Sequence, residues 1–195
     1  MKNSILNLLG LLIIIFAGYG CGNKDSDDRV AEDDDAVKYF PVESFFQQQV
    51  KTADSLAIDI YKLTDSNGLK DSIPLSRAQL KELSEVFTEI GLSDSANKVK
   101  YTESSFLDLA TNSYTFIYKA KEPSWPIKDI TILVDTLSTQ VKRVFINKII
   151  SNADSTISEK LGWKNNTTFF INRTVSVPGK AERTELITVA WQIPQ

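Results

Sequence analysis

The sequence predicts an α+β fold, with two helices packed on an antiparallel sheet of about five to seven strands. Apolar residues recur at helical spacing in two early segments, 42–54 and 76–91. After Asn97 the composition changes to Thr, Val, Ile, Tyr and Phe, with turn residues at intervals of roughly ten. Helices that precede a run of strands are typical of α+β rather than α/β domains.

The first helix is expected over residues 42–54. Pro41 suits the first turn of a helix because a proline lacks the N–H that such a position leaves unpaired. The apolar residues that follow at helical spacing are Val42, Phe45, Phe46, Val50 and Ala53.

A β-hairpin is expected next and ends near residue 74. Leu56, Ile58 and Ile60 alternate with other residues, which is the period of a strand. Asp65-Ser66-Asn67-Gly68 supplies turn residues that include an Asn-Gly pair. Continuation of the first helix through Tyr61 is the alternative.

The second helix carries the clearest boundary signals. Ser76 precedes Gln79 by three positions, a capping box that satisfies two backbone N–H groups at a helix start. Gly91 suits the C-terminal end. The apolar stripe between them consists of Leu80, Leu83, Phe87 and Ile90, and we expect it to face the core.

The remaining strands are expected over 112–120, 128–135, 141–150, 167–177 and 184–193. In the last of them Val189 and Trp191 share one face, whereas Thr188 and Gln192 share the other. One face of the sheet is therefore expected to be wet, and the helices are expected to cover the other face.

Residues 1–20 have the layout of an export signal, with a positive start at Lys2, an apolar stretch over 8–16 and small residues before Cys21. The apolar stretch is shorter than the roughly 20 residues that a membrane-spanning helix needs. Cys21 is the only cysteine of the chain, so it forms no internal disulfide.

The ending Gly18-Tyr19-Gly20-Cys21 resembles the lipobox of bacterial lipoproteins, although Gly18 stands where that family usually has leucine. The resemblance implies cleavage before Cys21, lipidation of its sulfur and anchoring by acyl chains such as palmitate. Plain secretion is the alternative.

Residues 21–38 are expected to form an acidic, disordered tether, because so charged a segment without aromatic residues cannot bury enough apolar area to fold. The acidic run resembles the signal that sends Bacteroidota lipoproteins to the outer face of the outer membrane. A self-repelling spacer is the alternative. We expect residues 39–195 to form a single domain on the periplasmic or the cell-surface side of the outer membrane.

The chain as a whole is similar to Bacteroidota envelope lipoproteins for which we know no established activity. The similarity is carried mainly by three segments, Tyr39-Phe40-Pro41-Val42 with Phe45-Phe46-Gln47, Val141-Lys142-Arg143-Val144-Phe145-Ile146, and Lys160-Leu161-Gly162-Trp163-Lys164. It implies an envelope location and one domain, and it leaves the mechanism open.

Composition excludes several kinds of chemistry. The chain has no histidine, which removes Ser-His-Asp catalysis and His-ligated zinc. A net charge of −3 without a basic stripe argues against a nucleic-acid partner. Asp65-Ser66-Asn67-Gly68 resembles part of a calcium loop, but Ser76 stands where the closing glutamate belongs, so turn chemistry is the better account. No metal, cofactor or catalytic residue is expected.

Two kinds of candidate site remain. Trp125 and Trp163 are expected in loops, where they would offer a ligand surface; the alternative is that each ring covers the core. Five Asp-Ser/Thr-apolar triplets resemble the acceptors of Bacteroidota O-glycosylation, although turns rich in Asp and Ser also produce such triplets. Their hydroxyl residues are Ser55, Ser72, Ser95, Thr136 and Ser155.

The sequence therefore favours a membrane-anchored, non-catalytic domain that binds an envelope protein or a glycan. One alternative is a carboxylate-dependent hydrolase that acts on glycans, which needs two acids facing one cleft. Glu82, Glu85 and Glu89 are at helical spacing, and a solvated helix face explains them better. The other alternative is a structural subunit of an outer-membrane complex.

Overall fold

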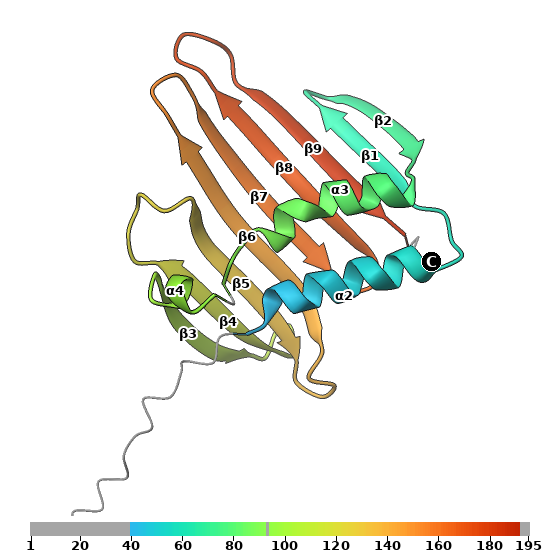
Figure 1. Ribbon diagram of the computed structural model, residues 1–195, viewed down its shortest axis with the longest axis vertical. Helices are drawn as coiled ribbons and strands as arrows, with labels where there is room; N and C mark the ends of the chain where they lie inside the picture. Colours follow the sequence, from blue (N-terminus) through green and yellow to red (C-terminus); the bar gives the residue numbers. More distant parts are fainter. Residues whose placement is uncertain (1–39, 93, 192–195) are drawn as a thin grey trace, which may run out of the picture. The chain divides into compact units, whose positions relative to one another are not determined.

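The computed structural model describes residues 40–92 and 94–191, and within them two long helices accompany a nine-stranded antiparallel sheet (Figure 1). The predicted export signal, Cys21 and the predicted acidic tether lie outside the described residues, so these expectations stay predictions. The α+β class is confirmed, but the sheet has nine strands, more than the five to seven expected. The helices are α2 (Val42–Ser55), α3 (Arg77–Thr88) and the one-turn α4 (Ser95–Lys98). The strands are β1 (Tyr61–Ser66), β2 (Leu69–Pro74), β3 (Tyr101–Asp108), β4 (Ser113–Ala120), β5 (Ile127–Asp135), β6 (Val141–Ser151), β7 (Thr156–Lys164), β8 (Thr168–Ser176) and β9 (Arg183–Ala190).

The sheet is a meander with one early hairpin added to its last strand. From β3 to β9 each strand pairs with the next one in the chain, and the order across the sheet is β2-β1-β9-β8-β7-β6-β5-β4-β3. The β1–β2 hairpin pairs with β9, with Tyr61 opposite Ala190. The hairpin near the start of the domain and the last strand of the domain are therefore neighbours in the sheet.

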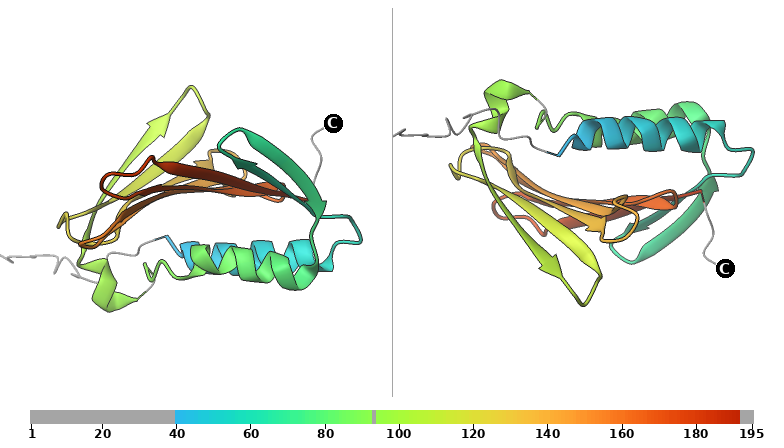
Figure 2. Two further views of the ribbon diagram at one scale, coloured as in Figure 1. Left: turned by 90° about the horizontal axis from the view of Figure 1, so that it is seen from above. Right: turned by 90° about the horizontal axis from the view of Figure 1, so that it is seen from below.

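Both long helices lie side by side on one face of the curved sheet (Figure 2), which we call the helix face. The hydrophobic core fills the space between these helices and the sheet, as the wet-face pattern of the last strand predicted. Trp163 of β7 is its central side chain. Its ring centroid lies 5.3 Å from Phe46 of α2, 5.0 Å from Phe87 of α3 and 4.7 Å from Phe169 of β8. Such aromatic pairs add about 0.5–1.5 kcal/mol each beyond the area that they bury.

The start of α3 confirms the predicted capping box. The Ser76 Oγ accepts the backbone N–H of Gln79, and the Gln79 Oε1 accepts the backbone N–H of Ser76. The helix ends at Thr88, and Gly91 adopts a φ of +67° in the turn that follows. Glycine adopts a positive φ at no steric cost, and a Cβ at this position would lie 2.8 Å from the Asn97 Nδ2, which explains the residue at this turn.

The hairpin β1–β2 is confirmed, but its first strand begins at Tyr61 rather than near residue 56. The guanidinium of Arg77 donates to the carbonyl oxygens of Ala53, Leu56 and Ile58, at 3.0, 2.5 and 2.8 Å. These bonds hold the segment after α2 against the start of α3. The carbonyl groups of this segment therefore accept hydrogen bonds from Arg77, and the segment does not pair with a strand of the sheet.

Two strands were missed by the sequence analysis. The segment 151–166 was expected to be a loop, yet it contains β7 with its residues alternating between the two faces. The inward Glu159 interrupted the apolar alternation on which the prediction rested, and Gly162 in the strand interior is unfavourable for a strand. The other missed strand, β3, is an edge strand with mostly exposed side chains, so it lacks an apolar pattern.

Candidate ligand-binding pocket

The three tryptophans of the chain occupy two different environments. Trp163 and Trp191 are buried, with 1% and 2% of their surfaces exposed. The prediction that Trp163 lies in a loop and offers a ligand surface is wrong, because β7 carries it into the core; the alternative that its ring covers the core holds. Trp125 lies in the loop between β4 and β5, as expected, and is only half-buried.

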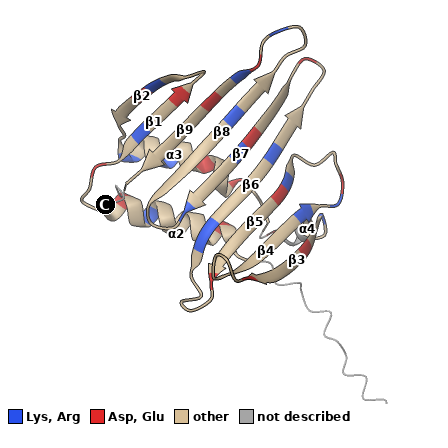
Figure 3. Ribbon diagram, turned by 180° about the vertical axis from the view of Figure 1, so that it is seen from behind, with Lys and Arg blue, Asp and Glu red and all other residues tan. Residues whose placement is uncertain are grey.

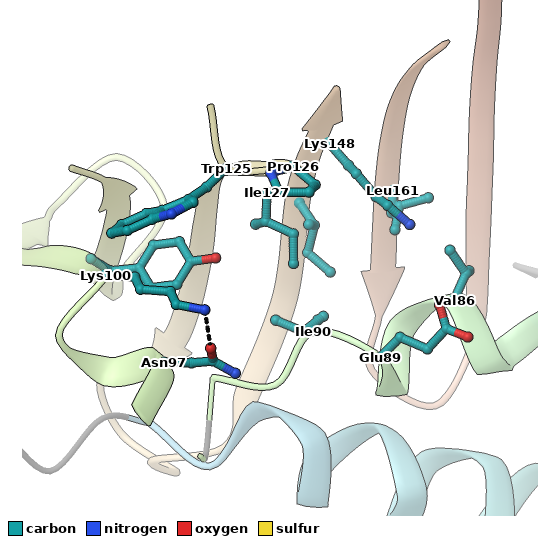
Figure 4. Close-up of a pocket in the computed structure, with 12 residues that line it drawn as sticks. Val86, Glu89, Ile90, Asn97, Lys100, Trp125, Pro126, Ile127, Lys148 and Leu161 are labelled. Carbon is teal, nitrogen blue, oxygen red and sulfur yellow. Dashed lines mark hydrogen bonds between the residues drawn. The ribbon is translucent and has the colours of Figure 1, made fainter. Parts of the chain in front are cut away.

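A hollow of about 260 Å³ opens beside Trp125 on the helix face (Figure 4). It lies between the C-terminal end of α3, the α4 turn and strands β3, β5, β6 and β7. The lining is mostly apolar and includes Val86, Ile90, Ile127, Ile146 and Leu161. Figure 4 shows Trp125 forming one wall, with Lys100 and Asn97 below it and Lys148 on the far side.

Hydrogen bonds from strands β5 and β6 fix the backbone of the loop that carries Trp125. The Nζ of Lys128 donates to the carbonyl oxygens of Pro123 and Trp125, at 2.5 and 2.6 Å. The backbone N–H of Ile149 donates to the carbonyl of Pro126 at 2.8 Å. The loop is thus fixed at both ends, so the ring needs little further ordering when a ligand contacts it.

The buried ring of Tyr101 lies beside the indole of Trp125. Its ring centroid lies 6.1 Å from that of Trp125, with the two planes tilted by 48°. Tyr101 is only 6% exposed, and its burial raises the pKa of the phenol. Raising that pKa favours the neutral form, so Tyr101 contributes an aromatic surface and a hydroxyl group rather than a charge.

The cationic groups of the pocket come from two lysines. The Nζ of Lys100 donates to the Asn97 Oδ1 at 2.6 Å and lies 5.9 Å from the centroid of the Trp125 ring. The Nζ of Lys148 lies 3.6 Å from the Glu159 Oε2. Glu89 at the end of α3 is the acid that lines the pocket.

Lys148 belongs to a row of alternating charges across the helix face. By strand register Lys148 of β6 stands opposite Glu159 of β7, which stands opposite Arg173 of β8, which stands opposite Glu185 of β9. Figure 3 shows basic and acidic residues alternating from strand to strand in this region. The Nε of Arg173 donates to the Glu159 Oε1 at 2.7 Å, and its Nη2 forms an ion pair with the same oxygen at 2.7 Å.

A more open trough continues from the pocket along α3. It shares Val86, Glu89 and Lys148 with the pocket, and Glu82 and Glu85 of α3 form its acidic side. These glutamates confirm the polar helix face that their spacing predicted. The other side is the outer part of the sheet, where the apolar residues are Ile150, Ile157 and Val175.

The acids around the trough offer little for hydrolysis. Glu159, the buried one, is engaged by Arg173 and Lys148, whereas Glu82, Glu85 and Glu89 stand on the exposed side of a helix. Within residues 40–92 and 94–191, no group of three or more Asp or Glu side chains is placed to hold a metal ion.

None of the helices in the described ranges is both long enough and apolar enough to cross a membrane.

The glycosylation candidates lie at exposed or half-exposed positions where they are described. Ser55 ends α2, Ser72 is in the edge strand β2, and Thr136 and Ser155 lie in turns; Ser95 begins α4, and its side chain is not described. Glycosylation stays a prediction.

The aspartates of the triplets have local roles. The Asp135 Oδ1 accepts the backbone N–H groups of Leu137 and Ser138, and the Asp94 Oδ1 accepts that of Ala96. Asp65 likewise accepts the N–H of Gly68, which confirms turn chemistry for the segment compared with a calcium loop. Turn and cap formation therefore accounts for two of the five triplets, those of Asp94 and Asp135.

Sequence reasoning found Trp125 but not its charged neighbours. Lys100 lies just before β3, a strand that was missed, and Lys148 points to the helix face in a strand whose other inward residues are apolar. The signal available was Lys148 itself, since a lysine at an inward strand position must reach a partner or an opening.

No protein-family model, no curated protein and no solved structure is significantly similar to the chain. The similarity to Bacteroidota lipoproteins therefore stays a prediction, and the function below rests on the geometry of the pocket.

Proposed function

We propose that this protein is a lipid-anchored envelope protein whose domain binds a ligand, without catalysis, in the pocket beside Trp125. The observation that carries the proposal is the half-buried Trp125 ring beside an apolar hollow of about 260 Å³, on a loop whose backbone is fixed by Lys128. Pockets lined by apolar and aromatic side chains with a few polar groups are typical of ligand sites. A hollow of this size suits one ring or one large side chain of a ligand.

The placement of the three tryptophans provides a direct binding assay. Because Trp163 and Trp191 are buried, acrylamide should quench mainly the fluorescence of Trp125. We expect a ligand from a collection of cell-wall glycan fragments, peptides and envelope metabolites to protect Trp125 in the full-length, detergent-solubilised protein. Trp125→Phe should remove the quenchable component and thereby assign it.

A matched pair of variants tests whether the pocket is the site. Trp125→Ala should abolish binding of the protective ligand, whereas Tyr114→Ala, at an exposed aromatic outside the pocket, should leave it unchanged. If no ligand protects Trp125, or if the two variants bind equally well, the proposed site is wrong.

The anchor is tested separately. We expect labelled palmitate to enter the protein in cells and Cys21→Ser to prevent both labelling and retention in the envelope fraction. A Cys21→Ser protein that stays in that fraction would contradict the anchor and leave the pocket untouched. The structural-subunit alternative predicts instead that the domain is recovered only within a larger complex.

A further inference from the structure

The pocket beside Trp125 carries more positive than negative charge, although the chain as a whole is acidic. The full sequence has a net charge of −3. The charged groups that line the pocket are Lys100, Lys148 and Glu89. Two cations thus face one carboxylate. An excess positive charge in an apolar hollow favours a negatively charged ligand group.

Lys100 is the cation with the least compensation. Its Nζ is held by a neutral amide oxygen of Asn97 and by the face of the Trp125 ring, and it forms no salt bridge with a described carboxylate. A half-buried ammonium in this position has donors left for an oxyanion, because a lysine has three. The Trp125 ring beside it offers an apolar surface to the rest of such a ligand.

Lys148 is compensated only in part. The Glu159 Oε1 already accepts the Nε–H of Arg173 and forms an ion pair with its Nη2, and the other oxygen lies 3.6 Å from the Nζ of Lys148. One carboxylate therefore serves two cations. The side chain of Lys148 is 20% exposed, so its ammonium is accessible from the pocket.

The apolar part of the lining indicates that the ligand also carries an apolar group. Ile127, Ile146 and Leu161 are among the apolar side chains of the lining, and the polar side chains are few. A neutral sugar ring would leave most of its hydroxyl groups without partners here, which costs binding energy. Resting on the proposed function, we infer that the pocket selects an amphipathic anion, an apolar group that carries a carboxylate or a phosphate, with its oxyanion beside Lys100.

The test uses four probes with the same eight-carbon chain: octanoate, octyl phosphate, octanamide and octylammonium. The full-length protein in detergent, at fixed ionic strength and below the critical micelle concentration of each probe, is titrated while the three indole N–H signals are followed by NMR. Trp125→Phe assigns the signal of Trp125. We expect one or both anions to shift that signal saturably, with octanamide binding more weakly and octylammonium weakest. The comparison of octanoate with octyl phosphate distinguishes the two oxyanions.

Two lysine variants test the pocket, and a third lysine variant is the control. Lys100→Met and Lys148→Met keep the alkyl stem and remove the charge, and we expect anion affinity to fall by at least about fivefold for Lys100→Met and by less for Lys148→Met. Lys160→Met removes an exposed charge on the opposite face of β7 and should leave affinity unchanged. Octanamide affinity should be the same in all three variants.

Two results would overturn the inference. If octanamide or octylammonium binds as tightly as the anions, or if Lys100→Met binds them like the Lys160→Met control, the pocket does not select an anion, and its function as a binding site stands. If no probe shifts the Trp125 signal, the amphipathic-anion class is wrong, and the acrylamide screen decides the proposed function independently.

Discussion

The carboxylate of Glu159 on β7 accepts the Nε–H of Arg173 on β8 and forms an ion pair with its Nη2, both 2.7 Å from the same oxygen. Glu159 is 4% exposed, whereas the Arg173 side chain is 46% exposed. The pair therefore places a buried acid under a cation that solvent can reach. Removing the cation leaves the acid with only the 3.6 Å contact to Lys148.

We expect Arg173→Met to destabilise the fold by about 1–3 kcal/mol, because a buried carboxylate loses a hydrogen-bond donor and the charge that pairs with it. Arg183→Met, at an exposed position of β9, is the control and should change stability by less than about 0.5 kcal/mol. Urea unfolding followed by circular dichroism measures both. Equal stability of the two variants would show that Lys148 alone satisfies Glu159.

Gly162 of β7 should not tolerate a side chain. A Cβ at this position would lie 2.1 Å from Cε1 of Phe170, whose ring covers the glycine from the neighbouring strand. Gly162→Ala should therefore destabilise the protein by about 1–3 kcal/mol through overpacking. In a double-mutant cycle, Phe170→Leu should recover part of that loss, and simple additivity of the two changes would contradict the contact.

The lowered pKa of Asp135 predicts that the folded protein loses stability in acid. Hydrogen bonds from the backbone of Ser138 and then of Leu137 lower the pKa of its carboxyl to about 2. Because the folded pKa lies below the unfolded value of about 3.9, its contribution is complete above pH 4 and is lost as the pH falls toward 2. NMR titration should give a midpoint near 2. In Asp135→Asn, the stability deficit relative to wild type should shrink over that same range; a deficit independent of pH would argue against the charge.

The capping box at Ser76 should stabilise α3 measurably. Ser76→Ala removes the oxygen that accepts the N–H of Gln79 and should cost about 1 kcal/mol. Ser76→Asp retains an acceptor and should stay within a few tenths of a kcal/mol of wild type. Thermal unfolding of the three proteins distinguishes these cases, and a Ser76→Ala protein as stable as Ser76→Asp would contradict the cap.

Local signals predicted the elements whose own residues specify them. The Ser76–Gln79 spacing, the Asn67-Gly68 turn and the apolar stripe of α2 each depend on neighbours in the sequence, and each has the expected outcome. Strand β7 depends on distant partners: its inward Glu159 is tolerated only because Lys148 and Arg173 lie in adjacent strands. No pattern within β7 itself carries that information.

The candidate site shows the same limit. Trp125 was identified because prolines mark its loop, but the ammonium beside it comes from Lys100, which reaches the ring only through the pairing of β3 with β4. The side chains opposite Trp125 come from α3 and from strands β5 to β7. A pocket built from segments so far apart in sequence is visible only once the strand order is known.

The pairing of β1 with β9 constrains when this domain can fold. Asn67 and Thr184, 117 positions apart, exchange two hydrogen bonds where the first hairpin joins the last strand. A chain delivered from its N-terminus, by a ribosome or through a translocation channel, presents the β1–β2 hairpin early, and an isolated hairpin is barely stable in water. Its inner edge must wait unpaired until residues 183–190 arrive, so that completion of the sheet is slow and comes last. During that interval the waiting edge is open to pairing with other chains, and a holding chaperone would have its greatest effect there.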